Sequence, residues 1–81
     1  MFYTYVLKSK KNGRWYYGST DNLKRRFEEH NSGIGGKYTS NNRPFELIYY
    51  EAYKKYALAK RAEKFFKSGY GREVLKNKLE I

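Results

Sequence analysis

The first twenty residues alternate aromatic and β-branched side chains in a pattern typical of two short strands. Residues 2–8 read Phe-Tyr-Thr-Tyr-Val-Leu-Lys, a composition that favours extended backbone. Asn12-Gly13 lies in the following segment, and this pair is a strong hairpin-turn signal because both positions tolerate positive φ. Residues 14–19 then predict the returning strand, so the chain opens with a β-hairpin.

Helical spacing replaces strand alternation after the hairpin. Thr20-Asp21 offers an N-cap for a helix over residues 22–30. Leu23 and Phe27 lie four positions apart and give this helix an apolar edge. The Asn-Ser-Gly sequence that follows is expected to end it.

The second half of the chain repeats the change from strand to helix. Residues 33–44 are rich in glycine and asparagine and predict a long loop, either a connection or a substrate contact. Residues 45–52 predict a third strand, residues 53–67 a helix and residues 72–79 a short terminal helix. The apolar positions at helical spacing in these two helices are Leu58, Ala62 and Phe65, then Val74, Leu75 and Leu79.

The order ββαβαα indicates an α+β fold in which helices pack on a small three-stranded sheet, antiparallel or mixed. A length of 81 residues predicts a single domain over residues 1–81 with a small core. The chain lacks cysteine, which excludes thiolate metal sites and fits a reducing compartment. No apolar run is long enough to span a membrane, and the N-terminal segment lacks signal-peptide features. We therefore expect a cytoplasmic protein without a membrane partner.

Charge and aromatic content narrow the function classes. The chain carries 18 Lys and Arg against 8 Asp and Glu, a formal net charge of +10. Such an excess attracts polyanions, so nucleic acid is the expected partner; a basic protein without such a partner is the alternative. Ten tyrosines and five phenylalanines indicate a folded domain, because disordered basic tails lack aromatic residues.

Tyrosines of the predicted hairpin supply the first candidate chemistry. Because side chains alternate along a strand, Tyr3 and Tyr5 share one face, and Tyr16 shares a face with Gly18. The hairpin allows Tyr5 and Tyr16 to approach each other. Gly18 presents no side chain beside them, which leaves room for a ligand to approach the backbone.

The same segments carry a resemblance to a known family. Residues 3–5 (Tyr-Thr-Tyr) and, after ten intervening residues, residues 16–18 (Tyr-Tyr-Gly) resemble the two short motifs that name the GIY-YIG nucleases. The first motif has Tyr-Thr in place of Gly-Ile but keeps its final tyrosine. Arg26 and His30, eight and twelve residues after the motif glycine, match the family's catalytic arginine and a position often held by histidine. Glu63 falls on the family's metal-ligand glutamate.

The resemblance implies hydrolysis of a DNA phosphodiester with one divalent cation, Mg²⁺ or Mn²⁺, held by Glu63. Mg²⁺ keeps several waters and tolerates a single carboxylate, and Arg26 offers planar donors to a phosphate oxygen. Tyr5 would act as general base or position the water, with Arg26 and a metal favouring its phenolate. Tyr16 would orient the water or the phosphate, and His30 would assist proton transfer or hold the phosphate.

The predicted function is therefore a metal-dependent endonuclease in DNA repair or DNA processing, with DNA as the partner and no small-molecule cofactor. Four further basic side chains are expected to contact the nucleic acid: Lys24, Arg25, Lys37 and Arg43. The alternative is a non-catalytic nucleic-acid-binding module that keeps the fold, an interpretation that the altered first motif favours. The natural substrate, the choice between DNA and RNA and the oligomeric state are not predicted.

The candidate residues on the hairpin and the first helix also have a structural interpretation. Tyr5 and Tyr16 are typical of cross-strand aromatic contacts. Arg26 is equally typical of a solvated helix position, and His30 lies near a helix C-terminus, where a cation interacts favourably with the helix dipole.

Glu63 has a structural interpretation of its own, because Lys60 and Lys67 lie at ion-pair spacing on the same predicted helix. The catalytic interpretation makes a geometric prediction instead. It requires four side chains to converge on one concave face beside the motif glycine: Tyr5, Tyr16, Arg26 and Glu63.

Overall fold

The computed structural model describes residues 1–34 and 41–79, which form three strands and three labelled helices. In chain order these are β1 (Phe2–Ser9), β2 (Trp15–Thr20), α1 (Leu23–Ser32), β3 (Phe45–Tyr53), α3 (Tyr56–Lys67) and α4 (Gly69–Leu79). The predicted α+β class and the order ββαβαα are confirmed. Lys37 lies outside the described residues.

β1 is the central strand of the sheet, whose order is β2-β1-β3. It runs antiparallel to both neighbours, and Tyr5 at its centre pairs with Gly18 on β2 and with Tyr50 on β3. Gly13 has a φ of 75°, which confirms the predicted turn between the first two strands. β2 is consequently an edge strand, which pairs with β1 alone within this sheet.

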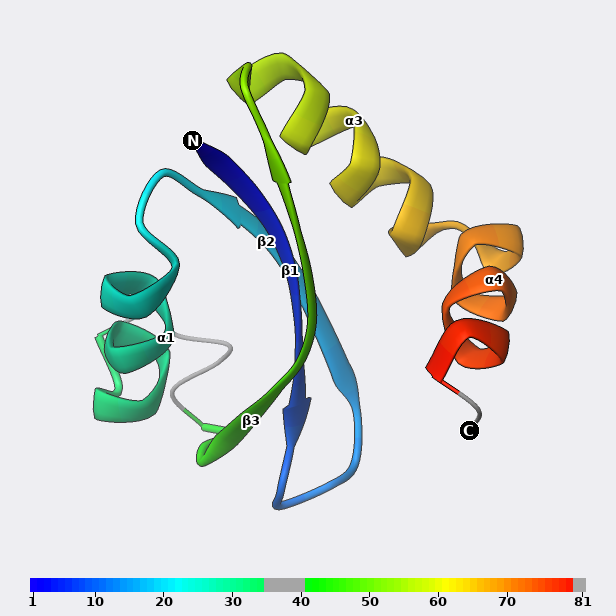
Figure 1. Ribbon diagram of the computed structural model, residues 1–81. Coiled ribbons are helices and arrows are strands. Elements are labelled where there is room, and N and C mark those ends of the chain that lie inside the picture. The colour runs from blue at the N-terminus through cyan, green and yellow to red at the C-terminus, as the bar shows by residue number, and fades with distance from the viewer. Residues whose placement is uncertain (35–40, 80–81) are drawn as a thin grey trace.

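Helices cover both faces of the sheet (Figure 1): α1 lies on one side, and α3 and α4 lie on the other. Strand alternation divides the core in the same way. Tyr5, Leu7 and Phe45 form a buried cluster, on which side chains of α1 pack. Val6 and Leu75 belong to the opposite cluster, under α3 and α4.

The buried face of α3 matches the prediction in part: Ala62 packs against the core as its spacing suggested, but the other two positions do not. Leu58 and Phe65 are 37% and 39% exposed, whereas Ala59 and Phe66 are buried. The helix begins at residue 56, three residues later than predicted, and it packs on the sheet through the positions that follow the predicted ones. An equally apolar neighbour, Phe66, occupies the core, so apolar spacing alone did not identify the inward face.

The ends of the other helices also differ from the prediction. The N-cap of α1 is Asn22 rather than Thr20-Asp21, because the Asn22 side chain accepts a hydrogen bond from the Arg25 amide. α4 begins at Gly69 rather than at residue 72. The Ser68 hydroxyl caps it by accepting from the Gly71 amide at 3.0 Å. The preceding helix ends at Lys67, as predicted, with Ser68 as its C-cap, and the next helix follows at once.

The described end of the predicted loop is tied to the hairpin. The Ser9 hydroxyl donates to the Asn42 carbonyl at 2.6 Å, and the Asn12 side-chain amide donates to the Asn42 side-chain oxygen at 2.8 Å.

Across the two described stretches, no helix combines the length and apolarity needed to cross a membrane.

Candidate active site at the β2 edge

Tyr5 is the centre of the candidate site. Its side chain is 4% exposed, and its hydroxyl oxygen is hydrogen-bonded to His30 Nε2 at 3.0 Å. The phenol ring lies directly over Gly18: a Cβ atom at that position would overlap the Tyr5 hydroxyl and would lie 2.5 Å from Tyr5 Cζ. The space beside Gly18 is therefore filled by Tyr5, and the expectation that it is open to a ligand is wrong.

α1 brings Arg26 and His30 to the same side of the sheet as Tyr5. The two side chains are four residues apart and leave one face of the helix. Arg26 Nη1 pairs with Glu29 Oε1 at 3.1 Å, and His30 is 5% exposed. Gly33 caps the helix with a φ of 90°, three residues after His30.

Burial controls the protonation of Tyr5 and His30. It raises the pKa of the Tyr5 phenol; the hydrogen bond and charge of Arg26 oppose this, and the Glu63 and Glu29 charges add to it. Burial also lowers the pKa of His30, and the Arg26 charge lowers it further. Both groups are therefore neutral at neutral pH. Arg26 acts on Tyr5 in the predicted direction, but burial outweighs it.

Tyr16 lies on the same face as Tyr5, as predicted, and pairs with Leu7 on β1. Its ring contacts the edge of Phe45 at a centroid distance of 5.2 Å, and it packs against the buried cluster on the α1 side. Tyr16, Tyr5 and His30 also line one pocket. The predicted aromatic packing and the predicted proximity to Tyr5 are thus both present.

Glu63 approaches from the other layer, on α3. It is 7% exposed, and its Oε1 accepts from the Ser19 hydroxyl at 2.6 Å. Lys60 Nζ lies 3.1 Å from Oε1, and Lys67 Nζ lies 2.7 Å from Oε2. Burial alone would raise the pKa of Glu63, but the hydrogen bonds from Lys67, Ser19 and Lys60 lower it. The carboxylate is therefore ionised and makes the ion pairs that its helix spacing predicted.

The four side chains do not share one concave face as expected, but Tyr5 lies within electrostatic range of both Arg26 and Glu63. Arg26 belongs to α1 and Glu63 to α3, and these helices cover opposite faces of the sheet (Figure 1). The two layers meet along β2, where Ser19 holds Glu63 directly after the glycine that lies under Tyr5. A cleft of about 550 Å³ spans the same edge and is lined by residues of β2, α1 and α3, among them Ser19, Arg26 and Tyr56. The candidate site therefore straddles the strand edge.

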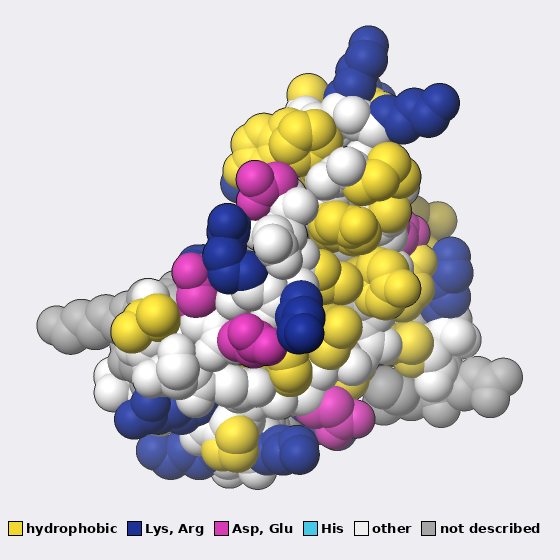
Figure 2. Space-filling model, turned by 60° about the vertical axis from the view of Figure 1, so that its left-hand side comes forward, with side chains coloured by type: hydrophobic (Ala, Val, Ile, Leu, Met, Phe, Trp, Pro, Cys, Tyr) yellow, Lys and Arg dark blue, Asp and Glu magenta, His cyan; other side chains and the backbone are white. Residues whose placement is uncertain are grey.

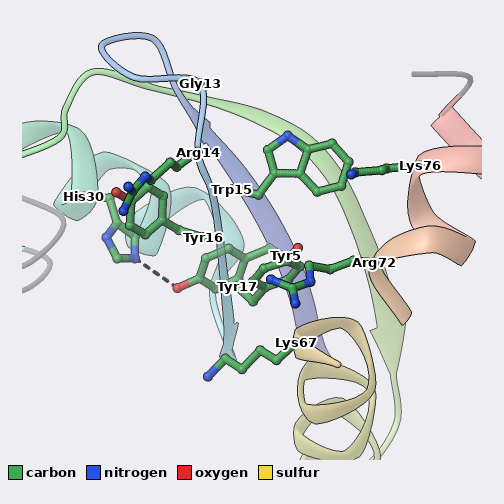
Figure 3. A pocket seen from close by; sticks show the side chains of 10 residues that line it. All are labelled: Tyr5, Gly13, Arg14, Trp15, Tyr16, Tyr17, His30, Lys67, Arg72 and Lys76. Carbon is green, nitrogen blue, oxygen red and sulfur yellow. Dashed lines mark hydrogen bonds between the residues drawn. The ribbon is translucent and has the colours of Figure 1, made fainter. Parts of the chain in front are cut away.

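A larger pocket of about 780 Å³ follows β2 from this point (Figure 3). Tyr5, Tyr16 and His30 line one end. Trp15 and Lys76 lie at the other end, between β2 and α4. The sequence analysis did not identify the contribution of α4 to this pocket, because no local sequence pattern predicts that the last helix lies beside the second strand.

The predicted DNA contacts are spread over the surface. Lys24 and Arg43 are exposed, and neither lines the cleft or the pocket. Arg25 lines the cleft beside Arg26, but its guanidinium pairs with Asp21 at 3.0 Å. Figure 2 shows acidic side chains beside basic ones on the α1 side of the molecule, so the net charge is not concentrated there.

Two partners of the site were not identified from the sequence. Glu29 holds Arg26, and its spacing of three residues on a predicted helix was the available signal. Ser19 holds Glu63, a contact across 44 residues that no local pattern encodes. The described parts of the chain contain no cluster of three or more His, Cys, Asp or Glu side chains that could together hold a metal ion.

Comparison with known proteins agrees with the motifs. The chain is 46% identical over 63 residues to the UPF0213 protein YazA of Bacillus subtilis; the match covers 78% of this chain and 63% of that protein. The UPF0213 protein CPE1444 of Clostridium perfringens is 39% identical over 67 residues, which cover 83% of this chain and 71% of the relative. The solution structure of the UPF0213 protein BH0048 from Bacillus halodurans matches with a TM-score of 0.57 and 38% identity, over 95% of this chain and 84% of that one.

The family model described as the GIY-YIG catalytic domain matches residues 1–79. This range contains both tyrosine motifs, the helix that carries Arg26 and His30, and the helix that carries Glu63. Such a domain has a nuclease fold, which agrees with the three-stranded sheet and the tyrosine at its centre. The chain therefore belongs to the GIY-YIG family.

Proposed function

We propose that the protein is a divalent-metal-dependent endonuclease that hydrolyses DNA phosphodiester bonds in DNA repair or processing. The observation that carries the proposal is the Tyr5 hydroxyl, 3.0 Å from a buried His30 whose pKa is lowered. A neutral imidazole nitrogen can accept a proton, so His30 can take the phenol proton when Tyr5 takes one from water. Tyr5 then acts as general base without a free phenolate, which its burial disfavours.

Arg26 is placed to bind the phosphate. Its guanidinium is fixed on one side by Glu29 at 3.1 Å and lines the cleft at the strand edge. Planar donors held in this way can bind a non-bridging phosphate oxygen and stabilise the charge that builds there in the transition state. Tyr16 packs beside Tyr5 on the same face and would limit the positions open to the attacking water.

Glu63 fits a divalent cation. Its carboxylate is ionised, and it already holds the two lysine ammonium groups within reach of the same strand edge. Both lysine side chains are about half exposed, so they can swing into solvent when a cation binds. A single carboxylate suffices because Mg²⁺ or Mn²⁺ retains waters as its other ligands. The cation would neutralise charge on the scissile phosphate and its leaving oxygen.

The test is nicking of supercoiled plasmid with Mg²⁺ or Mn²⁺, compared with EDTA. Tyr5→Phe and Glu63→Gln should lose cleavage and retain DNA binding. Arg26→Ala should lose about two to three decades in rate. Tyr50→Phe is the matched control, since Tyr50 pairs with Tyr5 across β1 and β3 but is 53% exposed; it should cleave as the wild type does.

A non-catalytic DNA-binding module is the second candidate, and the ion pairs of Glu63 favour it. In that case Lys60 and Lys67 are permanent partners of the carboxylate rather than placeholders. Absence of metal-dependent cleavage above the Glu63→Gln background, on plasmid, branched DNA and RNA alike, would reject the nuclease and leave the binding module.

A further inference from the structure

The far half of the large pocket has an unusual charge. Lys67, Arg72 and Lys76 line it, Arg14 lies at the His30 end of the same pocket, and no residue that lines the pocket is acidic. Of these four, only Lys67 takes part in an ion pair among residues 1–34 and 41–79. This differs from α1, where Arg25 and Arg26 are both paired with carboxylates. The pocket therefore concentrates positive charge that is not neutralised within the described chain.

Aromatic rings lie between these cations. Trp15 and Tyr17 alternate with Tyr16 along β2, so they face α4 rather than α1. The Tyr17 hydroxyl is buried, and no residue in the described chain forms a hydrogen bond with it. Figure 3 shows the Trp15 indole beside Lys76 and the Tyr17 ring beside Arg72. A buried hydroxyl without a protein partner is uncommon, and an ordered water or a ligand can satisfy it.

We propose that this half of the pocket binds the bases and phosphates of an unpaired nucleic-acid strand. Aromatic faces interleaved with cations suit unstacked bases, which stack on the rings while the cations hold the phosphates. A duplex offers only groove edges and phosphates because its bases are already stacked. The pocket volume of about 780 Å³ is that of a small-molecule site, so it admits nucleotides of a single strand.

The position of the pocket gives the substrate class. One end is formed by Tyr5 and His30, and the other by Trp15 and Lys76. A strand seated along β2 would thus carry its unpaired bases beside a phosphate at the candidate active site. This inference rests on the proposed function for the position of the cut, and it adds that preferred substrates have an unpaired segment next to it.

Trp15 is the only tryptophan in the chain, so its fluorescence reports directly on this pocket. The experiment titrates the metal-free protein, in EDTA, with a dodecamer of thymidine, a dodecamer of uridine and a 12-base-pair duplex. Quenching by either single strand at concentrations where the duplex has little effect supports the inference, and the ratio of the two identifies the preferred sugar. Quenching by the duplex at equal phosphate concentration, or no quenching by either strand, overturns it.

Variants locate the binding, measured by the fluorescence polarisation of a labelled thymidine dodecamer. Trp15→Leu keeps an apolar side chain against the core but removes the stacking surface, and should weaken binding by about tenfold. The double variant Arg72→Gln and Lys76→Gln should weaken it by about tenfold or more. The control is Lys54→Gln with Lys55→Gln, which removes the same charge from exposed positions between β3 and α3.

If Trp15→Leu is poorly folded, the two charge variants still test the inference, because both retain Trp15. Equal loss of affinity in the Lys54 and Lys55 variant would show general charge attraction and overturn the inference. The proposed function and this inference fail separately. Absence of cleavage with intact quenching would leave a protein that binds a single strand without cutting it. Cleavage together with unchanged strand affinity in Trp15→Leu would leave a nuclease that lacks this binding site.

Discussion

The Tyr5 hydroxyl occupies the space into which a side chain at Gly18 would project. The two residues are direct partners across β1 and β2, and a Cβ atom on Gly18 would overlap the phenol. The motif glycine is thus required by the motif tyrosine of the neighbouring strand, and it holds the hydroxyl within 3.0 Å of His30. The two short motifs form a single packing unit.

Gly18→Ala should displace the Tyr5 ring from His30. The ring is buried and cannot move without disturbing the cluster around Leu7, so overpacking should lower the free energy of unfolding by about 1–3 kcal/mol. The cleavage rate should fall further than the loss of folded protein explains, because the phenol of Tyr5 separates from its proton acceptor, His30. Urea unfolding and plasmid nicking on the same preparation measure both effects.

Gly69→Ala is the matched control for that substitution. A Cβ at Gly69 meets nothing within 4 Å, and the residue starts α4, so alanine should be neutral or stabilise by up to about 1 kcal/mol. If Gly18→Ala is tolerated as well as Gly69→Ala, the contact between the phenol and the glycine does not constrain the site.

Phe66 and Phe65 should respond differently to truncation. Phe66 is 5% exposed and packs with Val6 and Leu75, so Phe66→Ala should lower the free energy of unfolding by about 3–5 kcal/mol. Phe65 is 39% exposed, and Phe65→Ala should cost at most about 1 kcal/mol. Thermal unfolding of the two variants compares them, and equal costs would contradict the observed orientation of α3.

The sequence predicted the elements of the fold well because their signals are local. Alternating aromatic residues, the Asn12-Gly13 turn and helical spacing all act within a few residues, and each gave the correct element type. The inward face of α3 was predicted only in part, at Ala62, because Phe65 and Phe66 are equally apolar. The rotation of the helix about its axis decides which of them faces the sheet, and that rotation depends on the packing of the whole fold.

In the candidate site, too, the features that depend on local patterns were predicted and those that depend on the whole fold were not. Tyr5, Arg26 and His30 come together as expected, because strand pairing and the spacing of one helix are both readable from the chain. The placement of Glu63 depends on which face of the sheet α3 covers, which no local pattern encodes. Its partner Ser19 lies 44 residues away. The sequence therefore predicted the residue but not the edge geometry that connects it to Tyr5.

His30 should make the protein sensitive to mild acid. Its pKa is lowered in the folded state, whereas an unfolded histidine titrates near pH 6.5. Below that pH the unfolded chain binds a proton that the folded chain excludes, so stability falls as pH falls. The stabilising contribution is complete above about pH 6.5 and is lost as the pH drops from there to the folded-state pKa.

Urea unfolding at pH 7.5 and 5.5 measures this effect. The wild type should lose more stability between the two values than His30→Gln, which cannot titrate; the chain has no other histidine. Equal losses would mean that His30 is not kept neutral by the fold. Because a charged His30 cannot accept a proton from Tyr5, cleavage by the folded protein should decline only as the pH approaches the lowered folded-state pKa of His30.

Lys67 should compete with the metal for Glu63. Its ammonium lies 2.7 Å from Oε2, so a divalent cation must displace it. Lys67→Met should lower the Mg²⁺ concentration needed for half-maximal cleavage, measured at saturating DNA because Lys67 also lines the pocket. The stability cost should be at most about 1 kcal/mol, since the lysine is half exposed and screened by solvent. Lys64→Met removes an equal charge from an exposed position on the same helix and should leave the metal midpoint unchanged. A Lys67→Met midpoint equal to that of Lys64→Met would show that Lys67 does not occupy the cation's place on Glu63.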